Sequence, residues 1–412
     1  MQPAATERRA SARAPVSFAG DASALRGAEA RNPGIDALRG LSILLVVLHH
    51  LALRIPLKET ALAEVLPARL LAALNWNGWS AVFVFFVVSG FLIAGHAITR
   101  WGSLGRPDFR AFYGRRASRI LPLLLALLAV LSFLHLAGAK DYVIDGEGQS
   151  LGRALLAVLG LHLNWYEGTT GWLPGNWDVL WSLSIEEVFY LGFPIACALL
   201  RGERRILAAT ALFALALPVF LARLEGANEI WQEKAYLPGM AAIAAGVAAA
   251  IVAARVPPRR PTARWLCAGG GFGLLAALLW GPWLWRSLGN GTMLVLTLST
   301  AALLVGLHWH RRHAPRGAGM RGLGWLRAQG RLSYEIYLSH MFVVYAVVAV
   351  FKATGSDMRG GWMWFVPAVL ACWALGAGIE RAVTRPAGRW MLGRTLRGTE
   401  TVHAPRGEVA GQ

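Results

Sequence analysis

Long apolar runs alternate with short basic segments along almost the whole chain. Ten of these runs come close to the length of about 20 residues that an α-helix needs to cross a bilayer. They cover residues 35–54, 77–98, 119–138, 179–200, 205–223, 235–254, 265–285, 291–308, 332–351 and 361–383. The pattern predicts an all-α polytopic membrane protein with about ten transmembrane helices.

An eleventh apolar run, at residues 151–165, is shorter and leads into the polar and aromatic stretch LNWYEGTTGWLPGNWD. If this run crossed the bilayer, the arginines at 201–205 and in every later loop would change sides, against the tendency of Lys and Arg to stay in the cytosol. We therefore expect a re-entrant or interfacial segment here. With ten crossings both termini are cytosolic, as in a multi-pass protein of the inner (plasma) membrane.

Composition agrees with this class, because 56% of the 412 residues are hydrophobic and only 16% are charged. The net charge of +18 does not indicate a nucleic-acid partner, since the basic residues are spread over short segments between apolar runs. The three cysteines lie far apart in apolar spans, which predicts neither a disulfide framework nor a metal site. Residues 1–33 are expected to form a disordered cytosolic tail, residues 34–385 the membrane domain, and residues 386–412 a basic, loosely ordered cytosolic tail.

An arginine and a histidine share one face of the first span, RGLSILLVVLHH. The two residues are eleven positions apart, which is about three helical turns, so Arg39 and His50 point to the same side roughly 16 Å apart, while His49 points elsewhere. Ionisable groups are costly to bury in a membrane, so the pair suggests a functional site. The structural alternative is that the arginine reaches the lipid headgroups and the histidine bonds a neighbouring helix.

Three arginines precede the third span in FYGRRASRILP. Arg116 and Arg119 are one helical turn apart, and Arg115 lies alongside. Paired guanidinium groups on one helix face suit the oxygens of a phosphate, which would make this an anion clamp. The orientation bias of basic residues predicts arginines at the same place without any ligand.

Two acids enter an apolar helix at WSLSIEEVFY. Glu186 and Tyr190 are four residues apart and share a face, whereas Glu187 is turned by about 100°. Acids at this depth need partners that lower their cost, and we interpret them as functional.

A polar stripe follows one face of a late span in RLSYEIYLSHMFVV. Ser333, Tyr337 and His340 occupy positions i, i+4 and i+7. The stripe is explained equally well by hydrogen bonds between helices and by direct participation in chemistry.

Taken together, these motifs resemble the acyltransferase-3 family of membrane-bound O-acyltransferases, which includes bacterial O-antigen and polysaccharide acetylases. The matching pieces are GIDALRGLSILLVVLHH, WSAVFVFFVVSGFLI, RRASRILP, WSLSIEEVFY and SYEIYLSH, in the family's order across residues 33–390. The resemblance implies a ten-helix core that moves an acyl group from cytosolic acyl-CoA to a hydroxyl on the far side of the membrane. The acyl group expected is acetyl. Acyl-CoA would be a co-substrate, with no permanently bound cofactor. The acceptor would be a carbohydrate or lipid-linked glycan, or else a small-molecule natural product.

Residue by residue, the resemblance assigns His50 to the family's essential histidine and Arg39 to its paired arginine. Arg116 and Arg119 match the Arg-x-x-Arg that holds the CoA phosphates, and Glu186 matches the acidic position of the WSLSxE motif. The remaining matches are the polar positions Tyr337 and His340 and the helix-packing motif with Ser89 and Gly90. Val188 departs from the family, which commonly has Gln there.

Acyl transfer to a hydroxyl needs a base or a nucleophile, and a neutral imidazole can be either, so His50 is the candidate. Arg39 would stabilise the oxyanion or hold the CoA tail, and Glu186 would orient His50 or hold the acceptor. The polar residues expected to bind substrate are Trp172, Asn176, Trp177, Asp178, Tyr190, Tyr337 and His340. For the tryptophans an interfacial aromatic belt is the alternative. The rival function is a transporter or flippase with a proton relay, although the chain shows no clear repeat.

Overall fold

The computed structural model describes residues 32–313 and 322–400, and within these ranges the regular structure is helical, with no strand. The expected tail at residues 1–33 lies almost entirely outside the described residues, and so do residues 401–412. Because many helices are long and apolar, the prediction of an all-α polytopic membrane protein is confirmed.

Nine helical segments in the described ranges are long and apolar enough to cross a membrane. They are Pro33–Ala52 (α2), Gly78–Trp101 (α4), Phe109–Leu136 (α5), Gly175–Leu200 (α8 and α9), Glu229–Arg255 (α12 and α13), Arg260–Leu279 (α14), Gly291–His313 (α16), Ser333–Ala353 (α18) and Gly361–Gly393 (η3 to α20). Within the composite segments the bounds are Gly175–Asp178 (α8), Trp181–Leu200 (α9), Glu229–Lys234 (α12), Tyr236–Arg255 (α13), Gly361–Trp364 (η3), Phe365–Ile379 (α19), Glu380–Thr384 (η4, a π-helical segment) and Arg385–Glu400 (α20). The shorter helices elsewhere are Leu57–Glu59 (η1), Ala61–Glu64 (η2), Ala68–Trp76 (α3), Gly281–Leu288 (α15) and Gly324–Arg331 (α17).

The predicted span at residues 205–223 is a broken helix rather than a single one. It consists of α10 (Glu203–Leu215, 13 residues) and α11 (Leu217–Ala222, 6 residues), which meet at Ala216. Pro218 lies at the start of α11 and has no N–H to give to the carbonyl four residues earlier, so the α-helical ladder is interrupted there. Nine of the ten apolar runs expected from hydropathy are thus long helical segments, and the tenth is an interrupted pair of shorter helices.

The run at residues 151–165 also folds into short pieces. These are α6 (Leu151–Leu159, 9 residues) and α7 (Leu163–Thr170, 8 residues), joined by a turn in which Leu161 has a positive φ of 58°. Helices of this length extend about 12–14 Å, less than half the hydrocarbon thickness of about 30 Å. Neither helix can cross the membrane alone, in agreement with the predicted non-crossing segment.

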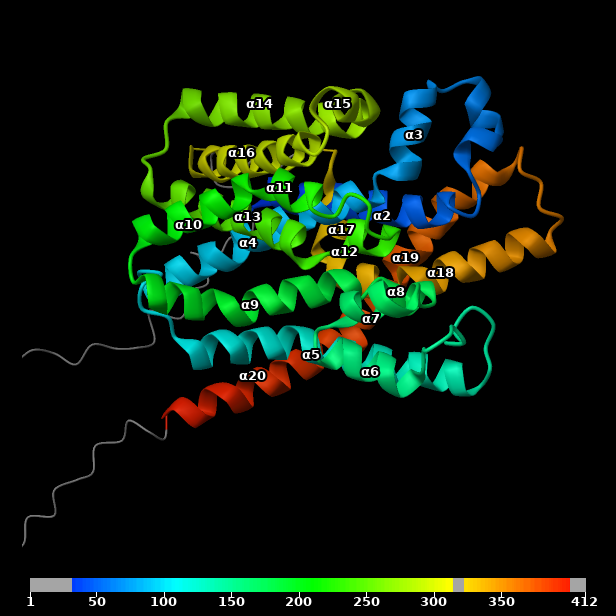
Figure 1. Cartoon of the computed structure of the whole chain (residues 1–412), viewed down its shortest axis with the longest axis horizontal. Coiled ribbons are helices and arrows are strands. Elements are labelled where there is room, and N and C mark those ends of the chain that lie inside the picture. The colour runs from blue at the N-terminus through cyan, green and yellow to red at the C-terminus, as the bar shows by residue number, and fades with distance from the viewer. Residues whose placement is uncertain (1–31, 314–321, 401–412) are drawn as a thin grey trace, which may run out of the picture. The chain divides into compact units, whose positions relative to one another are not determined.

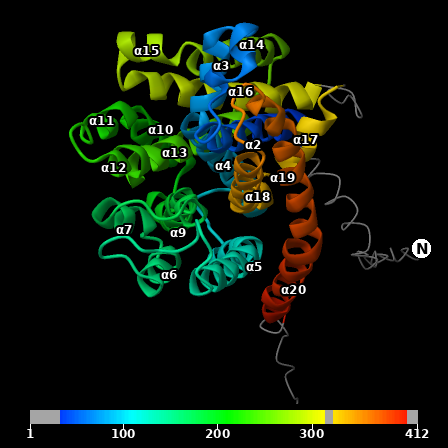
Figure 2. The same ribbon diagram turned by 90° about the vertical axis from the view of Figure 1, so that its right-hand side faces the viewer.

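Helices α2 and α4, which carry two of the predicted motifs, lie in the middle of the bundle (Figures 1 and 2). Helices α2, α4 and α13 lie between α14 and α16 on one side and α5 and α9 on the other (Figures 1 and 2). Helices α4 and α13 approach closely because glycines face the partner backbone on both. A Cβ added at Gly90 would lie 1.9 Å from the carbonyl oxygen of Ile243, and one at Gly246 would lie 2.0 Å from that of Val87.

The C-terminal region begins as a helix where a loosely ordered tail was expected. Helix α19 continues through η4 into α20, and α20 packs along α5 (Figure 2). Gly388 lets the two helices approach, since a Cβ there would already be 3.1 Å from the carbonyl oxygen of Ser118. The neighbouring helix therefore supports residues whose own sequence is basic and weakly apolar.

Candidate active site

The face of α2 that carries Arg39 and His50 packs against α18. Near one end of this contact, Nη2 of Arg39 donates a hydrogen bond to Oγ of Ser333 at 2.7 Å. Toward the other end, the ring centroids of His50 and His340 lie 5.0 Å apart. The predicted face of the first helix thus meets the predicted polar stripe of α18 at both ends.

The two rings differ in their hydrogen bonding. Nδ1 of His340 lies 2.7 Å from the carbonyl oxygen of Tyr337, which can only accept, so Nδ1 carries the proton. In the neutral ring Nε2 then holds a lone pair. This atom is buried and has no hydrogen-bond partner among the described residues. His340 therefore presents an unsatisfied acceptor in the region of His50.

Tyr337 joins α18 to the start of α9. Its hydroxyl accepts a hydrogen bond from Oγ of Ser182 at 2.8 Å and donates one to the carbonyl oxygen of Val179 at 3.0 Å. We call His50, His340, Tyr337 and Ser182 the histidine cluster. Ser182 lies one turn before Glu186 on α9, so these two polar side chains share one face of that helix.

Glu186 is held by two hydroxyl groups from two helices. Its Oε2 accepts from the Tyr190 hydroxyl at 2.7 Å and from Oγ of Ser89 at 3.1 Å, and these two hydroxyls are themselves in close contact. The motif expected to serve helix packing therefore has two parts: Gly90 packs against α13, while Ser89 bonds the carboxylate.

The three clamp arginines of α5 point to different environments. Arg116 forms an ion pair with Glu187 at 3.3 Å and lies 3.7 Å above the centroid of the Tyr190 ring. Nε of Arg115 donates to the carbonyl oxygen of Ala111 at 3.1 Å, and Arg119 is exposed. We call Ser89, Glu186, Tyr190, Arg116 and Glu187 the carboxylate cluster.

His49 faces a different part of the bundle, as the helical phase predicts. Its Nδ1 donates to the carbonyl oxygen of Asn75 at 2.5 Å, and a Cβ added at Gly78 would lie 2.3 Å from the imidazole. The ring therefore fills the space between α2 and the junction of α3 with α4.

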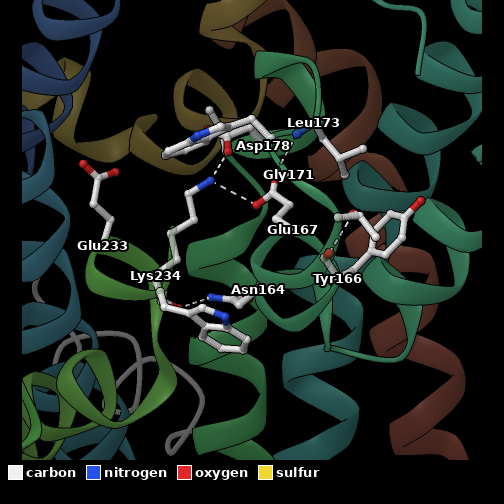
Figure 3. A network of polar contacts seen from close by, with 12 residues as sticks. Asn164, Tyr166, Glu167, Gly171, Leu173, Asp178, Glu233 and Lys234 are labelled. Carbon is white, nitrogen blue, oxygen red and sulfur yellow. Dashed lines mark hydrogen bonds and ion pairs between the residues drawn. The ribbon is translucent and has the colours of Figure 1, made fainter. Parts of the chain in front are cut away.

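A buried lysine organises the segment at residues 163–178, as Figure 3 shows. Nζ of Lys234 forms an ion pair with Glu167 at 3.0 Å and a second one with Asp178. It also lies 4.0 Å from the centroid of the Trp172 ring, and the Lys234 carbonyl accepts a hydrogen bond from Nδ2 of Asn164 at 2.6 Å. We call these five residues the lysine network.

Two members of the network, Lys234 and Glu167, are almost completely removed from solvent. The side chain of Lys234 is 2% exposed and that of Glu167 is 0% exposed. Burial, and after it the neighbouring Asp178 carboxylate, raises the pKa of Glu167 well above its ordinary value, while Lys234 acts in the opposite direction. A cation between two carboxylates fixes α7 and the end of α8 to the junction of α12 with α13.

The residues expected to bind an acceptor differ in their access to solvent. Trp172 is 45% exposed, whereas Asn176 and Trp177 are buried. Sequence reasoning missed Glu167 and Lys234, because one acid in a polar loop and one lysine at the end of a span are both ordinary. No group of three or more His, Cys, Asp or Glu in the described part of the chain is placed to hold a metal ion.

Comparison with known proteins agrees with the motifs. The acyltransferase-3 family, described as an acyltransferase domain, matches residues 32–380. Relatives include the O-acetyltransferase OatA of Staphylococcus aureus strain NCTC 8325 / PS 47 and of strain COL, each 27% identical over 179 residues, which is 41% of this chain and 25% of the relative. The alignment thus spans about a quarter of the length of these relatives, and no solved structure matches the chain significantly. Because the family match covers most of the chain and includes both clusters, the protein belongs to the acyltransferase-3 family.

Proposed function

We propose that the protein is a membrane O-acetyltransferase that uses acyl-CoA from the cytosol and acylates a hydroxyl of a carbohydrate on the outer side of the inner membrane. Family membership and the name of the relatives support acetyl transfer to oxygen. The observation that carries the proposal is the pairing of His50 with the unsatisfied His340 in a membrane helix bundle. Burying such groups is costly and needs a functional reason.

In this mechanism His50 removes the proton from the acceptor hydroxyl as its oxygen attacks the thioester carbonyl. The tetrahedral intermediate then collapses with cleavage of the carbon–sulfur bond. The acyl group is now an ester of the acceptor, and the CoA thiolate takes up the proton that His50 removed. Alternatively His50 first accepts the acyl group itself, releases CoA and then passes the group to the acceptor.

The other polar groups receive roles from their positions. Arg39 is bonded to Ser333, three turns of helix away from His50, which favours holding the CoA tail over stabilising the oxyanion. Arg116 and the exposed Arg119 would bind CoA phosphates on the cytosolic side. Glu186 is satisfied by Ser89 and Tyr190 and would keep α4 and α9 in register beneath the histidine cluster.

The acceptor would bind over the segment at residues 163–178. Trp172 offers a half-exposed flat face beside the Asp178 carboxylate, a combination that suits the apolar face and hydroxyls of a sugar. The lysine network holds both side chains in place.

The proposal is tested with the full-length protein in lipid nanodiscs supplied with radiolabelled acetyl-CoA and a panel of glycosides. Released CoA thiol and labelled ester are measured in the same samples. We expect the CoA thiol and the labelled ester to form in equal amounts. Mild alkali should hydrolyse the ester. A protein that binds or moves a panel compound without forming any ester would support a transporter instead.

A further inference from the structure

Arg54 lies one turn after His50, just beyond the end of α2, and adjoins three parts of the site. Its Nη1 donates to the carbonyl oxygen of His50 at 2.9 Å. Its guanidinium lies 4.9 Å from the centroid of the Tyr345 ring. The Tyr345 hydroxyl in turn accepts a hydrogen bond from the backbone N–H of Gly175 at 3.0 Å, at the start of α8. Arg54 therefore sits between the proposed base and the proposed acceptor segment.

Three imidazole rings lie in the electrostatic field of Arg54. Arg54 acts electrostatically on the rings of His49, His50 and His340. Lys234 is the other cation that acts on His50. Two cations close to one imidazole would repel a further positive charge and attract an anion.

The two cations differ in their counter-ions. Lys234 is neutralised by Glu167 and Asp178. Arg54 has no carboxylate within 4.0 Å among the described residues, and it is half-buried rather than solvated. A guanidinium has five N–H donors in a planar fork, which leaves several of them to bind a ligand.

We propose that Arg54 binds an anionic group of the acceptor, so that the acceptor is an acidic carbohydrate with a carboxylate or a phosphate near the acylated hydroxyl. This rests on the proposed function. A carboxylate or phosphate paired with the fork of Arg54 would lie one helical turn from His50, which brings a neighbouring hydroxyl toward the imidazole. The buried Nε2 of His340 has no hydrogen-bond partner among the described residues, so a ligand hydroxyl bound here would supply the donor that this atom lacks.

The test uses three methyl glucosides that share one sugar ring: the neutral glucoside, the glucuronide and the glucoside 6-phosphate. Binding to full-length protein is measured in nanodiscs of neutral phosphatidylcholine, so that no anionic lipid competes. We expect one of the two anionic probes to bind at least 10-fold more tightly than the neutral one, and which one does so distinguishes carboxylate from phosphate. Arg54→Met should remove this preference, a loss of about 10- to 100-fold for the anionic probe, and leave the neutral probe unchanged. Arg54→Lys should retain part of it, because the charge remains and the fork does not.

Arg359→Met is the matched control, since Arg359 is an exposed arginine paired with the exposed Glu64 at 2.9 Å. It should bind all three probes like the wild type. Equal binding of the three probes by the wild type, or an equal loss in the Arg54 and Arg359 variants, would overturn the proposal. Ester formation from acetyl-CoA is recorded separately, so a chain that transfers acetyl groups without an anion preference contradicts only the role of Arg54.

Discussion

His49 and His50 are neighbours in the chain but belong to different parts of the structure. His50 adjoins His340, whereas His49 bonds Asn75 and fills the space beside Gly78. We expect His50→Ala to abolish ester formation and to leave membrane insertion unchanged. His49→Ala should keep most of the activity and lose about 1 kcal/mol of stability with its hydrogen bond. Ester formation and thermal unfolding in detergent measure the two effects, and equal inactivation of both variants would contradict the assignment.

The arginines of α5 allow a sharper test of CoA binding. Arg119 is exposed, while Arg116 is already engaged by Glu187 and the Tyr190 ring. Arg119→Ala should therefore weaken binding of CoA at unchanged thermal stability, by about 10-fold or more for a lost charge-assisted bond. Arg116→Ala should also lower the unfolding temperature, because it leaves Glu187 without its ion-pair partner.

Titration of the purified variants with CoA, alongside their thermal unfolding, separates these outcomes. Arg110→Ala is a control for a general loss of positive charge on α5. If Arg119→Ala binds CoA like the wild type, this arginine only orients the helix in the membrane.

Helical phase was enough to predict that Arg39 and His50 share a face, since one helix and its pitch are the only inputs. The partners of that face were beyond prediction, because Ser333 is 294 positions away from Arg39 in the chain. The stripe Ser333, Tyr337 and His340 was also found from spacing alone. That the two patterns meet each other depends on how α2 and α18 pack, which no local pattern encodes.

At the scale of elements, close approach of α4 and α13 depends on glycine. Gly90→Ala would place a methyl group 1.9 Å from the carbonyl oxygen of Ile243, so the helices must separate. We expect a loss of about 1–3 kcal/mol or more and reduced yield of folded protein. Gly95→Ala on the same helix has no neighbouring atom within 4 Å and should be neutral or slightly stabilising. The unfolding temperatures of the two variants are compared directly. Equal stability would mean that α4 and α13 can separate at this contact with little loss of stability.

The elements that departed from expectation did so for local reasons. Residues 205–223 are predominantly apolar, and hydropathy does not register that Pro218 has no N–H to donate to the helical ladder. The segment after residue 385 is basic enough to resemble a tail, yet α5 offers it a surface to pack against. Apolar length predicts membrane segments well, but not whether each one is continuous.

At the scale of the whole molecule, the lysine network joins segments that are far apart in the chain. Lys234 is 67 positions from Glu167 and 56 from Asp178. Lys234→Met should be strongly destabilising, by about 3–5 kcal/mol, because the buried Glu167 and the partly buried Asp178 lose their cation. Arg255→Met removes a more exposed pair with Glu203, in which the arginine is 45% exposed, and should cost at most about 1 kcal/mol. Similar unfolding temperatures for the two variants would contradict the difference in burial.

The two ion-pair sites lie near opposite ends of α13. Arg255 ends this 20-residue helix and pairs with Glu203 at the start of α10, and it donates to the carbonyl oxygen of Gly102 at the end of α4 at 3.0 Å. Lys234 lies just before the other end. A helix of 20 residues extends about 30 Å, the thickness of the hydrocarbon core.

We therefore expect residues 163–178 and residues near 203 to lie on opposite sides of the membrane, as the distribution of arginine predicts. Gly168 is a poor reporter, because a Cβ there would lie 2.4 Å from the Trp231 ring, whereas Thr169 and Arg204 are exposed. In a background without Cys197, Cys267 and Cys372, a single cysteine at Thr169 should react with a membrane-impermeant maleimide from outside intact spheroplasts. A single cysteine at Arg204 should react only after the membrane is opened. If both positions react only after the membrane is opened, the 163–178 segment is cytosolic, and the proposed acceptor site on the outer side is wrong.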